Sequence, residues 1–125
     1  MKPLAKLRRI AEVEFADIVV QTDRLGTKLR ILLVDTSYVD VWASHKIHGR
    51  FGFHWERQHI DGQIYRYDNF PDTNWSDVST FPFHFHEGNQ DQVVPAPFPP
   101  SMEKGFREFM AFVQRKMDDY RSERR

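Results

Sequence analysis

The stretch Arg50-Phe51-Gly52-Phe53-His54-Trp55-Glu56-Arg57 decides the fold, because bulky apolar residues alternate along it with polar or small ones. Side chains of a β-strand point to opposite faces in turn, so every second residue shares a face. One face then carries Phe51, Phe53 and Trp55, and the other carries Gly52, His54 and Glu56. The alternation predicts a strand of an antiparallel sheet that packs a core on one face and keeps the other polar.

The residues that follow extend this sheet. Asp61-Gly62 predicts a hairpin turn, and Ile64-Tyr65-Arg66-Tyr67 predicts the returning strand. The segment 80–86 alternates again, with Phe81, Phe83 and Phe85 on one face and Pro82, His84 and His86 on the other. Because proline cannot donate to a strand ladder, we expect an edge strand or a short extended piece here.

The residues that precede the stretch are rich in β-branched and apolar side chains. The segments 15–22, 28–34 and 38–44 predict strands, and 23–26 predicts a turn. Apolar residues recur at helical spacing from Pro3 to about Val13, with proline at the start, which predicts a first helix.

A second helix is predicted at the other end of the chain. Four prolines make 93–100 extended, and Ser101 then suits an N-cap. The apolar residues that follow at helical spacing, to about Tyr120, are Met102, Phe106, Phe109, Met110, Val113 and Met117. The residues 121–125 are expected to form a frayed tail.

These patterns predict a single α+β domain over 1–125. It comprises a helix at 1–14, a curved antiparallel meander of about five to six strands at 15–86, an extended loop at 87–100 and a helix at 101–120. Both helices are expected to pack on the same face of the sheet.

The composition excludes several classes of protein. The chain of 125 residues has no cysteine, which removes disulfides, thiolate metal sites and thiol catalysis together. It lacks an apolar run long enough to span a membrane and begins without a signal-peptide pattern, so we expect a cytoplasmic protein with no membrane contact. Eighteen Lys+Arg balance eighteen Asp+Glu, so the chain lacks the basic excess usual for broad nucleic-acid binding.

The net charge of zero nevertheless conceals an uneven distribution of charge along the chain. Residues 51–100 hold two Lys/Arg and seven Asp/Glu, whereas 1–50 and 101–125 carry net charges of +3 and +2. All six histidines lie between His45 and His86. The middle of the chain is therefore where histidine, arginine and carboxylate chemistry is expected.

The His84-x-His86 pair is the first candidate, because two imidazoles at i and i+2 on a strand share one face. Such a pair suits proton transfer or anion binding. It would bind a metal only with a third ligand such as His54, Glu56 or Asp68. The sequence assigns no metal and no cofactor, and a polar sheet face without chemistry remains an alternative.

Two further groups accompany this pair. His54-x-Glu56 could supply a base and its orienting carboxylate, or could be a cross-strand polar pair with Arg66 or Asp68. Arg66 and Arg57 could clamp an anion, or could form Arg66–Asp68 and Arg57–Glu56 surface pairs. The candidate catalytic residues are His84, His86, His54, Glu56 and Arg66. The candidate substrate-binding residues are Arg57, Trp55, Asp68, Asn69 and Tyr67.

The ordered motifs from Phe53 to Arg57, Asp61-Gly62, Tyr65 to Pro71, Thr80 to His86 and Val93-Val94-Pro95 together resemble the TumE-like family of toxin–antitoxin proteins. The resemblance covers roughly 15–115. It implies a small cytoplasmic toxin encoded beside a small helix-turn-helix antitoxin. It supplies no catalytic residues.

Three functions remain open on these grounds. The first is a type II toxin that acts on RNA or another nucleic acid. In the RNA case His84, His86 and His54 transfer protons and Arg66 and Arg57 stabilise charge, so the protein could be a ribonuclease. Trp42, Trp55 or Tyr67 would stack on an unpaired base. The second is a non-enzymatic interaction module, and the third is a metal-dependent hydrolase that uses His84, His86 and a carboxylate. Edge strands would also permit a homodimer.

Overall fold

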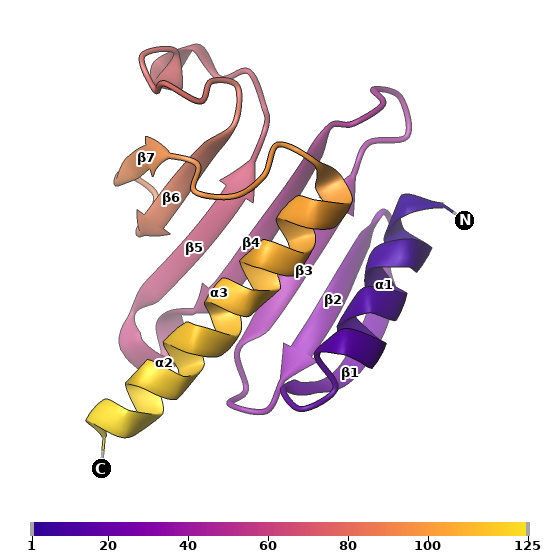
Figure 1. The fold of residues 1–125 in the computed structure, drawn as a ribbon, viewed down its shortest axis with the longest axis vertical. Coiled ribbons are helices and arrows are strands. Elements are labelled where there is room, and N and C mark those ends of the chain that lie inside the picture. Colours follow the sequence, from indigo (N-terminus) through magenta and orange to yellow (C-terminus); the bar gives the residue numbers. More distant parts are fainter. Residues whose placement is uncertain (1, 125) are drawn as a thin grey trace.

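The computed structural model describes residues 2–124, which form an α+β domain built on one sheet of seven strands (Figure 1). The strands are β1 (Val19–Leu25), β2 (Lys28–Leu33), β3 (Tyr38–Ala43), β4 (Phe51–Arg57), β5 (Gln63–Asp68), β6 (His84–Gly88) and β7 (Val93–Pro95). The helices are α1 (Pro3–Glu14), the single turn α2 (Gln58–Asp61), the 3-10 turn η1 (Thr73–Trp75) and α3 (Met102–Glu123).

The sheet is an antiparallel meander in which each strand pairs with the next one along the chain, in the order β1 to β7. Short connections suffice for this topology, because consecutive strands are spatial neighbours. The strand count exceeds the predicted five to six, because Val93–Pro95 pairs with β6 and forms a seventh strand.

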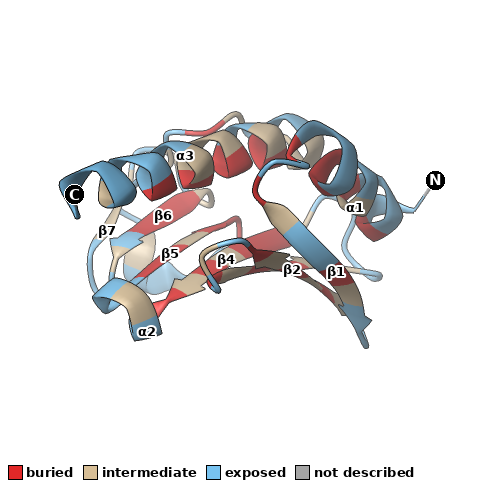
Figure 2. Ribbon diagram, turned by 90° about the horizontal axis from the view of Figure 1, so that it is seen from below, coloured by how far each residue is buried: buried red, intermediate tan, exposed pale blue. Residues whose placement is uncertain are grey.

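Both long helices cover the same face of the curved sheet, as predicted (Figure 2). The apolar stripe of α3 is buried against that face, and Ser101 caps the helix by accepting a hydrogen bond from the Lys104 amide. The largest buried side chains of β4 are Phe51, Phe53 and Trp55, as their alternation predicted. The opposite, helix-free face carries the polar side chains of the central strands, among them Asp40, His54, Glu56, Arg66 and Asp68.

Several predicted boundaries were wrong. The chain turns over 15–18 before β1, and β1 continues through Leu25, so 23–26 is mostly strand and the turn lies at Gly26–Thr27. The expected hairpin is present, since β4 pairs with β5, but its connection is the single helical turn α2, after which Gly62 adopts the left-handed conformation with φ 77°. The helix α3 extends to Glu123, so most of the predicted tail is helical, and Arg125 lies outside the described residues.

The predicted strand at 80–86 begins only at His84. The Phe83 amide donates to the Thr80 carbonyl across a turn, which removes 80–83 from the ladder. Phe81 is consequently 37 % exposed rather than buried with Phe85. The two histidines nevertheless occupy the strand, on the face opposite Phe85.

Candidate functional site

On the polar face of the sheet, the register of β5 against β6 brings distant residues together. Asp68 of β5 lies opposite His84 of β6, and Arg66 of β5 lies opposite His86. Side chains directly opposite each other on one face of an antiparallel pair lie close enough to interact. Residues sixteen to twenty positions apart in the chain thus meet because a long loop separates two adjacent strands.

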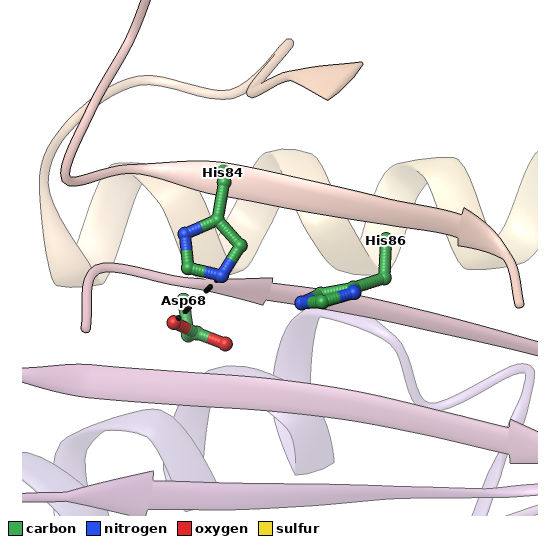
Figure 3. A group of neighbouring side chains, drawn as sticks. All are labelled: Asp68, His84 and His86. Carbon is green, nitrogen blue, oxygen red and sulfur yellow. Dashed lines mark ion pairs between the residues drawn. The ribbon is translucent and has the colours of Figure 1, made fainter. Parts of the chain in front are cut away.

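Asp68, His84 and His86 form a compact cluster on this face (Figure 3). One ligand atom of each residue lies within 4.8 Å of the others, and His84 Nε2 is 3.3 Å from Asp68 Oδ1. The two imidazole rings are 5.0 Å apart between centroids. All three residues are buried, with exposed fractions of 3 % for Asp68, 2 % for His84 and 6 % for His86.

The orientation of both rings is fixed by the backbone. His84 Nδ1 lies 3.0 Å from the Pro82 carbonyl oxygen, and His86 Nδ1 lies 2.9 Å from the Gln90 carbonyl oxygen. A carbonyl oxygen only accepts, so each Nδ1 carries the hydrogen and donates it. In the neutral form each ring therefore keeps a lone pair on Nε2, the nitrogen available to its partners in the cluster.

The carboxylate of Asp68 is held as firmly as the rings. Its Oδ1 accepts a hydrogen bond from the Phe70 amide at 3.0 Å, and its Oδ2 accepts one from Arg66 Nε at 2.7 Å. The predicted Arg66–Asp68 pair is therefore present. It joins a cation to the cluster, and the side chain of Arg66 remains 31 % exposed.

Burial lowers the pKa of His86 below its ordinary value, and the neighbouring His84 and Arg66 act in the same direction. The hydrogen bond to the Gln90 carbonyl and the charge of Asp68 oppose this lowering without reversing it. These surroundings therefore favour the neutral imidazole of His86 over its protonated form.

Aromatic side chains border the cluster. The ring of Trp75, in η1, meets the His86 ring edge-on at a centroid distance of 5.9 Å. Trp42 of β3 lies opposite Gly52 and stacks on Phe70 at 5.2 Å, and the Arg50 guanidinium lies 5.7 Å from the Phe70 ring centroid. We call Trp42, Phe70 and Arg50 the aromatic platform. Phe70 is 37 % exposed, whereas Trp42 and Arg50 are half-buried.

The other predicted site residues lie outside the cluster. His54 pairs with Glu56 through Nε2 and Oε1 at 3.2 Å, on the same face, and neither residue reaches Asp68. Arg57 points to the helix-covered face, where it is buried and binds Asp35 and Asp61 rather than Glu56.

Three predicted substrate-binding residues are structural in this arrangement. Trp55 and Tyr67 are fully buried in the core under α3. Asn69 accepts a hydrogen bond from the Phe51 amide and donates one to the Gly49 carbonyl, so its amide secures the β3–β4 connection.

Sequence reasoning missed Trp75, Phe70 and Gly52. Trp75 and Phe70 lie in the loop between β5 and β6, where no strand periodicity indicates a direction. Gly52 was assigned to the polar face without a role. Its lack of a side chain leaves the space into which Arg66 extends, since a Cβ at position 52 would lie 3.0 Å from Arg66 Nη2.

Fold and cluster together define a small α+β protein with a histidine–aspartate centre on the helix-free face of a meander sheet. A family model described as Toxin TumE matches residues 1–117, and the chain belongs to this toxin family. Membership implies an antitoxin as partner. No curated protein and no solved structure matched the chain. Within residues 2–124, no helix has the length and apolar character needed to cross a membrane.

Proposed function

We propose that this protein is the toxin of a type II toxin–antitoxin pair and that it cleaves RNA in the cytoplasm at the Asp68–His84–His86 cluster. The observation that carries the proposal is the convergence of two oriented imidazoles, a carboxylate and an arginine on one sheet face. Cleavage of a phosphodiester by the neighbouring 2′-hydroxyl needs a base, an acid and a cation, and the cluster offers one group for each role.

His86 is the proposed base. Its Nε2 lone pair would take the proton of the 2′-hydroxyl while that oxygen attacks the adjacent phosphorus. Because Nδ1 donates its hydrogen to the Gln90 carbonyl, the neutral ring is held in the tautomer that has its lone pair on Nε2.

His84 is the proposed acid. Its Nε2 lies 3.3 Å from Asp68 Oδ1, an ion-pair distance, so a proton on this nitrogen would face the carboxylate. Its proton would pass to the 5′-oxygen as the phosphorus–oxygen bond breaks. The products are a 2′,3′-cyclic phosphate and a 5′-hydroxyl, so atoms and charge balance without a co-reactant.

Arg66 would stabilise the charge that develops on the phosphate oxygens. Its Nε is held by Asp68, and its partial exposure leaves the outer nitrogens of the guanidinium available to a phosphate. The aromatic platform, next to Arg66 on the same face, would stack an unpaired base. Of the three stacking residues named from the sequence, Trp42 is the one that the fold leaves accessible.

Access to the cluster depends on the loop that follows β5. Both imidazoles are buried, and Trp75 from this loop meets the ring of His86. Substrate binding would therefore require the loop to move aside, and the tryptophan would report that movement by its fluorescence. The partner is proposed to be a small helix-turn-helix antitoxin, and a homodimer through a sheet edge stays a prediction.

The test uses untagged protein, total RNA and an unstructured oligoribonucleotide, with and without EDTA. Wild type should cleave both RNAs in the presence of EDTA. His86→Ala and Arg66→Ala should each slow cleavage by about 100-fold or more. The matched control is the double variant His45→Ala/His48→Ala, which removes two exposed histidines of the β3–β4 loop.

Two outcomes would overturn the proposal. Equal cleavage rates of wild type and the His84→Ala/His86→Ala variant would show that the cluster takes no part in the reaction. The second outcome is that wild type leaves RNA intact, while expression of the same double variant still arrests growth. That outcome would instead identify a non-enzymatic interaction module.

A further inference from the structure

We propose that Asp68, His84 and His86 bind one divalent transition-metal ion of the zinc class, through Asp68 Oδ1 and the two Nε2 atoms. A tetrahedral ion with bonds of about 2.0–2.1 Å to nitrogen and oxygen holds its ligand atoms about 3.3 Å apart. His84 Nε2 and Asp68 Oδ1 already lie 3.3 Å apart. The ligand atom of His86 lies within 4.8 Å of both, so a small movement of this side chain that keeps the Nδ1 hydrogen bond to Gln90 would complete the set.

The surroundings of the three ligands are those that a metal site requires. Metal-binding histidines donate their other ring hydrogen to a carbonyl or a carboxylate, which fixes the tautomer. Both histidines do so here, to Pro82 and Gln90. Figure 3 shows the rings projecting from the same strand toward the space beside Asp68.

The carboxylate retains room for an ion. An ionised carboxylate offers about four lone-pair positions. The Phe70 amide takes one position on Oδ1, and Arg66 Nε takes one on Oδ2. Oδ1 therefore keeps a second position for a metal. Arg66 then orients the ligand rather than competing with it.

The donor set selects the class of metal. Imidazole nitrogen with one carboxylate oxygen suits zinc and neighbouring transition metals, whereas magnesium and calcium prefer oxygen ligands alone. Three protein ligands also leave a tetrahedral ion one open position, as in reactive rather than purely structural zinc sites.

Metal binding would regulate the proposed cleavage, and this step rests on the proposed function. A bound ion occupies both Nε2 atoms, so His86 could no longer accept a proton and His84 could no longer carry one there. Zinc should therefore inhibit a reaction that proceeds in EDTA.

The binding experiment is independent of cleavage. Untagged protein is stripped with EDTA, dialysed, and titrated with zinc by calorimetry and with cobalt by visible absorption, with circular dichroism as a check of folding. The variants are Asp68→Asn, which keeps the side-chain shape, and His86→Gln. The control is again His45→Ala/His48→Ala.

Wild type and control should bind one ion per chain, with the visible cobalt absorption of a tetrahedral site. Each cluster variant that remains folded should bind at least about tenfold more weakly, since even second-shell changes at metal sites cost 10–100-fold. Equal affinity in wild type and both variants, or no binding to wild type, would overturn the metal site.

The cleavage assay separates the two proposals. Cleavage in EDTA that zinc suppresses supports both. A different result would separate them: the protein binds one ion, EDTA abolishes cleavage and zinc restores it. That result would support the metal site, but it would overturn both the metal-free acid–base mechanism and the proposed inhibition by zinc.

Discussion

Gly52 of β4 lies directly beneath the guanidinium of Arg66, and a Cβ at position 52 would come 3.0 Å from Arg66 Nη2 and 3.4 Å from Asp68 Cβ. The glycine thus leaves the space that the guanidinium of Arg66 occupies beside the cluster. Its backbone φ lies outside the left-handed region, so the position demands a small residue because of space rather than conformation.

Gly52→Ala should therefore affect activity more than stability. The added methyl meets the flexible end of Arg66, which can move away, and alanine is favoured over glycine in a strand by about 0.5–1 kcal/mol. We expect the free energy of unfolding in urea to change by less than about 1 kcal/mol, while RNA cleavage falls as Arg66 shifts. Unchanged cleavage would show that the position of Arg66 is not used.

Arg57→Leu should destabilise the fold without touching the cluster. The residue is 1 % exposed, and its guanidinium binds Asp35 at 3.0 Å and Asp61 at 2.7 Å and lies over the Trp55 ring. Its loss leaves two partly buried carboxylates unpaired, at a cost of about 2 kcal/mol. Urea unfolding measures this, with exposed Arg9→Leu as the control. A loss no larger than in the control would contradict the structural role of Arg57.

Gly105→Ala should destabilise the protein although alanine favours helices. A Cβ at this buried position of α3 would lie 2.9 Å from the Pro99 carbonyl oxygen and 3.1 Å from Tyr67 Cε2. The Pro99 oxygen accepts the Tyr67 hydroxyl, so neither neighbour moves freely. We expect a loss of about 1–3 kcal/mol in thermal or urea unfolding, whereas exposed Ser122→Ala should be neutral or stabilising. A gain in stability at position 105 would refute this packing.

Asp40 should contribute to stability in a pH-dependent way. Burial raises the pKa of its carboxyl, but hydrogen bonds from Arg30 and Lys28 outweigh burial and hold the pKa below 3.8. A depressed folded-state pKa gives stability that is present above the unfolded pKa and is lost as pH falls through the folded value.

Asp40→Asn should therefore lose about 1 kcal/mol at pH 7, and the two proteins should converge in stability as pH falls through the lowered folded-state pKa of Asp40. Urea unfolding at a series of pH values measures both effects. A constant difference in unfolding free energy down to pH 2 would argue against the ion pair as the cause.

The sequence by itself determined the fold class and the two faces of the sheet. Alternation along Phe51–Arg57 and helical spacing after Ser101 report local geometry, because a strand repeats every two residues and a helix every 3.6. The same alternation correctly placed His84 and His86 opposite Phe85, and Arg66 on the face of Asp68. The predicted strand boundaries were wrong where a local turn replaced pairing with the neighbouring strand, as at Thr80–Phe83.

Only the tertiary structure decided which polar residues meet. The register of β5 against β6 places Asp68 beside His84, and a shift by one residue would have placed Tyr67 there instead. It also decided that Arg57 is buried under α3 with Asp35 and Asp61 as partners, because a charged side chain by itself does not indicate burial on the covered face. The cluster arises from residues separated by a long loop, and their separation in space is set by hydrogen bonding between strands that no local pattern encodes.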